Sequence, residues 1–269
     1  MRFLIVLSTL LTFSDPVASF ACGPDTDCRL GDRHYRIALP EGQGADPVGA
    51  VVFAHGYRGT AESVMRNKAL RRMVSDMGLA LIALKSADDD WVIPYAPRHM
   101  DSDGSVEFRY VEAVLEDAAR RFPIDGARLM AAGFSAGGMM VWNLACAMPE
   151  RFAGFAAIAG TFWMKPPTQC AEPAASLVHI HGTSDPTVPL KGRAILETRQ
   201  GDVAEALDMY GTLGDFRPSG ETSFEDLTCQ TRRNASGEIL DFCLHPGGHS
   251  FRSSYLKFAW ERLRAAGQL

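Results

Sequence analysis

The sequence predicts an α/β fold in which a mostly parallel sheet is covered by helices on both faces. Short apolar runs alternate with amphipathic segments along most of the chain, which is the pattern of strand–helix–strand units. The strand-like runs are largely continuous in apolar residues, as expected where both faces of a sheet are buried. One of them, 129–133, leads into Ser135 on a Gly-rich turn, and a helical segment follows directly.

Each expected element follows from its local pattern. Residues 35–39 alternate polar and apolar side chains, as a half-exposed antiparallel strand does. The helical segment 106–122 starts near a cap at Ser105 or Asp103. The other expected strands are 49–54, 79–84, 129–133, 155–159, 177–181 and 239–244, and the other helices are 65–77, 136–145, 204–213 and 255–265.

Two irregular segments, 85–104 and 161–175, are rich in Pro, Asp and aromatic residues. Both follow expected strands, so both should lie at the carboxyl edge of the sheet, where open α/β folds bind ligands.

The N-terminus has the features of a secretory signal peptide. Arg2 precedes an apolar stretch, 3–13, that is too short to span a bilayer, and small residues follow. We expect cleavage after Ala21, with cleavage after Ser19 as the alternative. The predicted organisation is a signal peptide, 1–21, and a single catalytic domain, 22–269, that is secreted or periplasmic and not stably inserted in a membrane.

The composition excludes some classes of partner. The chain has 269 residues, 46% of them hydrophobic, which suits one large globular domain or at most two small ones. Its net charge of −5 and its lack of long basic runs argue against nucleic-acid binding. We expect a monomer.

Six cysteines in an exported chain indicate disulfides, although six cysteines allow fifteen pairings. Proximity favours a disulfide between Cys22 and Cys28, which would close a small N-terminal loop. Cys229 and Cys243 flank a turn between two strand-like runs and could pair across it. The remaining two cysteines could pair with each other or be free thiols in the core. A metal site is the competing interpretation, but the chain has no C-x-x-C motif and no close Cys/His cluster, so we expect neither metal nor cofactor. The three favoured pairs are Cys22 with Cys28, Cys146 with Cys170, and Cys229 with Cys243.

Ser135 is the candidate nucleophile. It is the central residue of a G-x-S-x-G motif, 133–137, between an expected strand and an expected helix. A serine in that context lies on a sharp turn that exposes its hydroxyl above the sheet, and the small flanking residues make room for the turn. Without the flanking elements, the motif is more typical of an ordinary turn than of a catalytic serine.

A nucleophilic serine needs a base and an acid, which in this fold class follow it in the order Asp or Glu, then His. His249 is the better candidate base because it lies in a flexible turn between the last strand and the last helix, whereas His245 adjoins the strand and is expected to be structural. Asp185 follows the strand 177–181 and is the candidate acid. The alternative role for Asp185 is to start a turn with Pro186.

Two backbone N–H groups are expected to form an oxyanion hole. Ala136, directly after the nucleophile, supplies one, and Tyr57, in the loop after strand 49–54, supplies the other. His55 could be a second base, but we expect it to brace this loop. Together these residues predict acyl transfer to water through an acyl-enzyme.

The chain resembles the secreted polyhydroxybutyrate depolymerases and feruloyl esterases of the α/β-hydrolase superfamily. The resemblance extends over almost the whole chain after residue 21 and implies the same triad roles for Ser135, Asp185 and His249. It rests on Cys22-Gly23 with Arg36, His55-Gly56-Tyr57, 133–140, 160–163, His181-Gly182-Thr183-Ser184-Asp185 and Gly247-Gly248-His249-Ser250.

The expected substrate is a small or oligomeric ester: hydroxyalkanoate, feruloyl or acetyl. No binding module or Ser/Thr-rich linker is evident in the sequence, which favours a soluble ester over a solid polymer. Trp163, Phe162, Trp91 and Tyr95 could form a stacking wall for the substrate, or they could simply cover the core. Arg98 and His99 are expected on solvated surface. Two alternatives remain open, an exported serine peptidase and a non-catalytic binding protein on the same fold.

Overall fold

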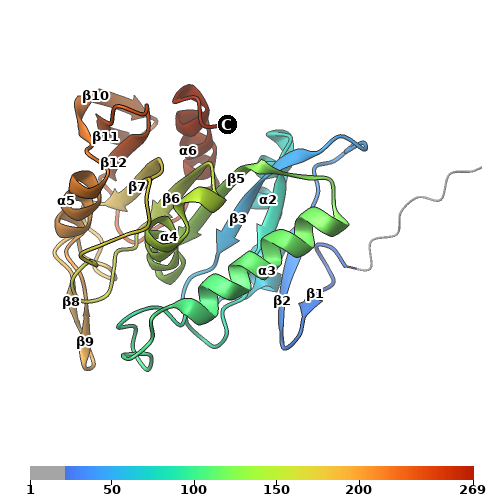
Figure 1. The fold of residues 1–269 in the computed structure, drawn as a ribbon, viewed down its shortest axis with the longest axis horizontal. Coiled ribbons are helices and arrows are strands. Elements are labelled where there is room, and N and C mark those ends of the chain that lie inside the picture. Colours follow the sequence, from blue (N-terminus) through green and yellow to red (C-terminus); the bar gives the residue numbers. More distant parts are fainter. Residues whose placement is uncertain (1–21) are drawn as a thin grey trace, which may run out of the picture.

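The computed structural model describes residues 22–269 (Figure 1), so the expected signal peptide lies outside the described residues. The strands are β1 (Cys28–Leu30), β2 (Arg33–Ala38), β3 (Val48–Ala54), β4 (Ala80–Ala83), β5 (Ile124–Phe134), β6 (Gly154–Ile158), β7 (Leu177–Gly182), β8 (Arg193–Ile195), β9 (Thr198–Gln200), β10 (Arg217–Phe224), β11 (Leu227–Arg233) and β12 (Ile239–His245). The helices are α1 (Ala61–Arg66), α2 (Lys68–Asp76), α3 (Ser105–Arg121), α4 (Ala136–Ala147), α5 (Val203–Leu213) and α6 (Ser253–Ala265), with a short 3₁₀ turn at Pro149–Arg151.

The main sheet has ten strands in the order β1-β2-β4-β3-β5-β6-β7-β12-β11-β10. The six central strands, β4 to β12 in that order, pair in parallel, and the outer strands on each side pair antiparallel. The predicted α/β class is therefore confirmed, with antiparallel extensions at both edges.

Two apolar cores lie on opposite faces of this sheet. Along β5, Leu129 and Ala131 pack with α3, α4 and α5, whereas Met130 and Ala132 pack with α1, α2 and α6. Figure 1 shows α3, α4 and α5 together in front of the sheet. Because successive side chains of a strand point to opposite faces, a continuously apolar strand serves both layers.

The expected helix 65–77 is two helices. Asn67 ends α1 and begins α2, and its side-chain oxygen accepts the Leu70 N–H at 3.1 Å. Such a local side-chain bond competes with helix continuation. The cap of α3 also differs from the prediction, because Gly104, at φ 79°, occupies the cap position and the Asp103 carboxylate accepts the Ser105 N–H at 2.9 Å.

Four strands had no clear signal in the sequence. β1, β8 and β9 have three residues each, and β10 contains Pro218 and Gly220 at a bulge. β8 pairs only with β9, and the hairpin they form lies at the lower left of Figure 1. Segments this short, or interrupted by Pro and Gly, become strands because a partner strand is present.

All six cysteines are paired, in the three combinations that the sequence favoured: Cys22–Cys28, Cys146–Cys170 and Cys229–Cys243. The last of these joins residues that face each other in the β11–β12 register.

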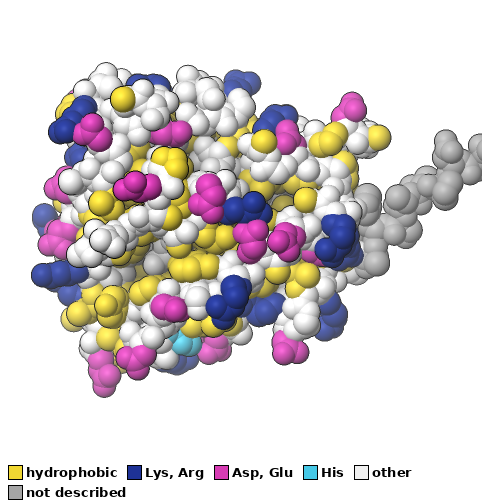
Figure 2. Space-filling view, in the orientation of Figure 1, with side chains coloured by type: hydrophobic (Ala, Val, Ile, Leu, Met, Phe, Trp, Pro, Cys, Tyr) yellow, Lys and Arg dark blue, Asp and Glu magenta, His cyan; other side chains and the backbone are white. Residues whose placement is uncertain are grey.

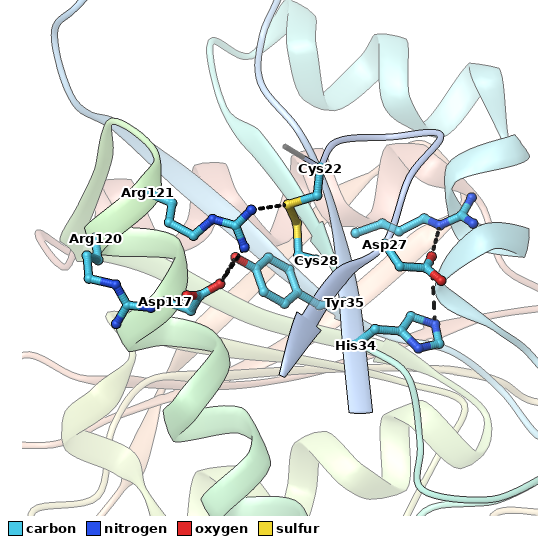
Figure 3. The surroundings of a disulfide bond; sticks show 9 residues. Cys22, Asp27, Cys28, His34, Tyr35, Asp117, Arg120 and Arg121 are labelled. Atoms are coloured by element: carbon cyan, nitrogen blue, oxygen red, sulfur yellow. Dashed lines mark hydrogen bonds and ion pairs between the residues drawn. A yellow bond between two sulfur atoms is a disulfide. The ribbon is translucent and has the colours of Figure 1, made fainter. Parts of the chain in front are cut away.

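The N-terminal disulfide lies in a polar cluster (Figure 3). The Tyr35 hydroxyl donates to Asp117 at 2.9 Å, and Arg121 contacts both Asp117 and the Cys22 sulfur. Burial and the neighbouring Asp117 raise the pKa of Tyr35, so its hydroxyl stays a donor. This cluster attaches the start of the described chain to α3.

The Cys146–Cys170 disulfide attaches the irregular segment after β6 to α4. Replacing both cysteines with serine should lower the free energy of unfolding by about 3 kcal/mol, because the bond closes a long loop. The Cys22/Cys28 pair closes a much shorter loop and is the matched control with a smaller expected loss. Urea unfolding of both variants would test this, and an equal or larger loss for the control would contradict it.

On the face shown in Figure 2, Lys and Arg side chains are interspersed with Asp and Glu rather than gathered in one basic area. Within residues 22–269, no helix is both long and apolar enough to cross a bilayer.

Candidate active site

Ser135 joins the end of β5 to the start of α4 in a strained conformation, with φ 59° and ψ −122°. Its N–H donates to the Ile158 carbonyl at 2.9 Å, and its own carbonyl accepts the Met139 N–H at 3.0 Å. These bonds hold the turn between β6 and α4. A non-glycine residue at positive φ costs free energy and is typical of functional sites.

Glycines around Ser135 let the turn approach its neighbours closely. A Cβ on Gly137 would lie 1.9 Å from the Ala54 carbonyl oxygen, and one on Gly133 would lie 2.3 Å from the Gly137 oxygen. Neither space admits a side chain, since real contacts of this kind exceed 3 Å. The motif's small residues therefore have the steric role that the sequence indicated.

Asp185 and His249 come together from loops after β7 and β12. Nδ1 of His249 lies 2.7 Å from Oδ2 of Asp185. Oδ1 of Asp185 accepts the backbone N–H groups of Thr187 and Val188 at 2.8 and 2.9 Å. The carboxylate is therefore held by its own loop on one oxygen and meets the imidazole with the other.

The His249 ring also packs beside the nucleophile turn, with its centroid 4.7 Å from that of Phe134. The structure thus brings His249 between Asp185 and the residue that precedes Ser135. Within the described chain, no hydrogen bond joins the Ser135 hydroxyl to His249, and this bond is commonly loose in the absence of a substrate.

Tyr57 and Ala136 line the same cavity as Ser135, which measures about 310 Å³. Ala136 is the first residue of α4, where N–H groups have no intrahelical acceptor. The loop after β3 is held by Arg58 N–H, which donates to Asp89 at 2.7 Å, and by Gly59 N–H, which donates to Gly56 at 2.9 Å. Tyr57 N–H has no acceptor among residues 22–269.

His55 is a buried brace of this loop. Its Nε2 accepts the Ser86 N–H at 3.2 Å, its Nδ1 contacts the Gly56 carbonyl at 2.8 Å, and the Trp91 indole donates to its carbonyl at 2.8 Å. Burial lowers the pKa of His55 to about 4. Both ring nitrogens are thus occupied by backbone groups.

The four aromatic residues that were candidates for substrate contact lie in three different places. Trp163 lines the cavity at Ser135 and also a neighbouring cavity of about 890 Å³, which Tyr95 and Phe162 line. Trp91 is fully buried between the loop and the core, so of its two expected roles the structure supports covering the core and not contact with the substrate. Its indole N–H needs an acceptor when buried and finds the His55 carbonyl.

Two polar residues that the sequence placed on solvated surface also line the cavity: one is exposed and the other half-buried. Arg98 and His99 belong to the irregular segment before α3, and both lie at the cavity with Asp90. Arg98 has φ 70°, so its loop position is strained. No periodic pattern marks an irregular loop, and only their position next to an expected strand end could have indicated these residues.

The β8–β9 hairpin forms another wall of the cavity through Arg193, Leu196 and Gln200. It is tied to both irregular segments: Thr198 donates to the Tyr95 carbonyl at 2.8 Å, and the Met164 N–H donates to Arg199 at 2.7 Å. Within residues 22–269, no three or more His, Cys, Asp or Glu side chains are grouped as a metal site requires.

Asp90 gives the cavity a pH-sensitive carboxyl group. Burial raises the pKa of Asp90 from 3.8 to about 6. The hydrogen bond that its carboxylate accepts from the backbone N–H of Trp91 offsets this rise only in part. Ionisation of Asp90 therefore lowers the stability of the folded state. This cost is fully present above pH 6 and disappears as pH falls below 3.8.

Asp90→Asn should raise the free energy of unfolding by about 2 kcal/mol at pH 8 and leave it unchanged at pH 3.5. The amide oxygen can still accept the Trp91 N–H, so only the charge is removed. Thermal unfolding across this pH range would measure the effect, and a gain that persists at pH 3.5 would contradict the electrostatic explanation.

The chain is similar to several known esterases. It is 27% identical over 251 residues to NocK of Nocardia uniformis subsp. tsuyamanensis, named as an esterase, covering 81% of this chain and 70% of NocK. It is 26% identical over 260 residues to a protein named as feruloyl esterase C of Aspergillus terreus, covering 91% and 88%.

The fold is shared with solved esterase structures. An acetyl xylan esterase from Aspergillus awamori superposes with a TM-score of 0.64 at 12% identity, covering 92% of this chain and 98% of that one. An S-formylglutathione hydrolase from Agrobacterium tumefaciens superposes with a TM-score of 0.55 at 17% identity, covering 86% and 90%. Residues 43–211, more than half of the chain, match the family described as Phospholipase/Carboxylesterase. The protein is therefore an esterase with the α/β-hydrolase fold and belongs to the Phospholipase/Carboxylesterase family.

Proposed function

We propose that this protein is an exported serine carboxylic-ester hydrolase that works through Ser135, His249 and Asp185. The observation that carries the proposal is the 2.7 Å contact between Asp185 and a histidine that packs beside the Ser135 turn. We assign catalysis to a single domain, 22–269, and secretion or periplasmic export to the segment before it.

The reaction follows from the roles of these groups. His249 takes the hydroxyl proton as the Ser135 oxygen attacks the ester carbonyl, and Asp185 orients and stabilises the imidazolium. The N–H groups of Tyr57 and Ala136 would stabilise the oxyanion, a contribution of about 3 kcal/mol for each donor. The alcohol leaves with the proton from His249, and water then hydrolyses the acyl-enzyme by the same steps.

For the substrate, we propose a soluble or oligomeric hydroxyalkanoate, feruloyl or acetyl ester. Trp163 lines both the cavity at Ser135 and the larger one, so this ring is placed to contact an ester that extends from one cavity toward the other. The name of one similar protein, feruloyl esterase C, supports the feruloyl member of this range.

A fluorophosphonate probe tests the nucleophile directly. We expect one covalent adduct, mapped by mass spectrometry to the peptide that contains Ser135. Folded protein that does not react would refute the proposal and favour a non-catalytic binding protein.

A hydrolysis panel tests the substrate class. Methyl ferulate, acetylated xylan, hydroxybutyrate oligomers and p-nitrophenyl esters would rank the acyl groups. A peptide amide hydrolysed faster than p-nitrophenyl acetate would instead identify a peptidase.

A further inference from the structure

A chain of hydrogen bonds runs from the apolar core to the loop that carries Asp185. The Trp142 indole N–H donates to Nδ1 of His179 at 3.2 Å, and Nε2 of His179 lies 3.0 Å from Nδ1 of His181. Nε2 of His181 lies 2.7 Å from the Val188 carbonyl oxygen. The three side chains are fully buried, on α4 and β7, and none is required by the reaction described above.

The two ends of this chain determine where its protons lie. An indole N–H can only donate, and a backbone carbonyl can only accept. Each imidazole must therefore accept at Nδ1 and donate at Nε2. A second proton on either ring would make two N–H groups face each other, so the pattern admits only neutral histidines.

The surroundings act in the same direction. Burial lowers the pKa of His179 and of His181. The titratable groups that face His181 are His179 on β7, Asp185 and His249 in the loops, and His245 on β12. The Val188 carbonyl and Asp185 favour a charged His181, whereas burial, His249 and His245 oppose it, and the net shift of its pKa is downward.

His181 acts at the loop that holds the carboxylate. Its Nε2 lies 3.5 Å from Oδ2 of Asp185, the same oxygen that meets His249. Val188, which accepts from His181, also donates its N–H to Oδ1 of Asp185 at 2.9 Å. The last two residues of the hydrogen-bond chain thus contact both carboxylate oxygens of Asp185: His181 lies near Oδ2, and the Val188 N–H donates to Oδ1.

We propose that Trp142, His179 and His181 form a positioning network for Asp185, which keeps His181 neutral with its Nε2–H directed to the Asp185 loop. The inference rests on the proposed triad. Its consequence is that, within the described chain, the carboxylate stabilises a positive charge on His249 and not on His181.

Trp142→Phe removes the first donor and keeps an aromatic ring in the core. Nδ1 of His179 then has no obligatory donor, so both histidines can exchange tautomers and His181 can take a proton beside Asp185. The pKa of His181 should therefore rise in this variant, although burial still opposes its charge, and kcat/KM at pH 5.5 should fall below that of the wild-type protein.

The shape of the pH profile separates positioning from general damage. For wild-type protein, log kcat/KM for p-nitrophenyl acetate should rise with a slope of about one on the acid side, and for Trp142→Phe with a slope approaching two. Trp260→Phe, in the opposite core, is the matched control and should keep the wild-type slope. An unchanged slope in Trp142→Phe would overturn the proposal.

A conservative replacement provides the rescue. Glutamine at position 181 keeps an amide N–H for Val188 but cannot titrate. Adding His181→Gln to Trp142→Phe should restore a slope of about one, and a slope that stays at two would overturn the proposal.

Imidazole ¹⁵N NMR of the wild-type protein tests the network without any activity. Of the seven histidines in the chain, the two assigned by His179→Gln and His181→Gln should remain neutral, with the proton on Nε2, from pH 5 to 9. Titration of either ring in this range, or a proton on Nδ1, would overturn the proposal. Because this readout is independent of hydrolysis, it stands apart from failure of the esterase proposal.

Discussion

Replacing Ser135 with alanine is expected to lower kcat for p-nitrophenyl acetate by about 10⁴-fold or more. Alanine at this position leaves the proposed oxyanion donors and the cavity in place but removes the hydroxyl that we propose forms the acyl-enzyme. Labelling by a fluorophosphonate should be lost in the same variant. Initial rates and gel fluorescence measure the two effects.

The matched control is Ser223→Ala, on the exposed edge strand β10. It should keep wild-type rates and labelling. Substantial hydrolysis by Ser135→Ala, with labelling retained, would show that another residue is the nucleophile.

Asp185→Asn is expected to lower kcat by about 10⁴-fold while the protein stays folded. The asparagine oxygen can still accept the N–H groups of Thr187 and Val188, which preserves the loop. Its amide would, however, donate toward Nδ1 of His249 and place the imidazole proton on Nε2. That tautomer cannot accept the proton of the Ser135 hydroxyl.

Asp202→Asn is the control for this substitution. Asp202 also accepts a backbone N–H at a helix start, that of Ala204 at 2.8 Å, but it has no histidine partner. Little loss of kcat is expected there. A loss below tenfold in Asp185→Asn would mean that Asp185 only shapes the turn before Pro186.

The central strands and the serine turn could be predicted because their signals are local. β3, β5 and β7 are short apolar runs, and the glycines around Ser135 sit in one five-residue motif. Chain order then narrowed the candidate partners of Ser135 to Asp185 and His249. That these two are in contact is a result of the parallel register of β7 and β12, which brings their loops to one edge.

The cavity walls could not be predicted in the same way. Trp91 and Arg98 lie seven residues apart in one irregular segment, yet Trp91 is buried against His55 while Arg98 lines the cavity. The β8–β9 hairpin supplies Gln200 and Leu196 from a region without periodicity. In such segments, the direction of a side chain depends on backbone bonds to distant residues.

By itself, the sequence determined the α/β class, the two-sided core, the steric requirement for glycine around Ser135 and the order of the candidate triad. These depend on hydrophobic period and chain order, which neighbouring residues encode. Only the tertiary structure decided which loop residues face the cavity and how the His179–His181 pair connects Trp142 to the Asp185 loop. Those contacts join α4, β7 and the loops at the sheet edge, so they exist only once the sheet has brought these elements together.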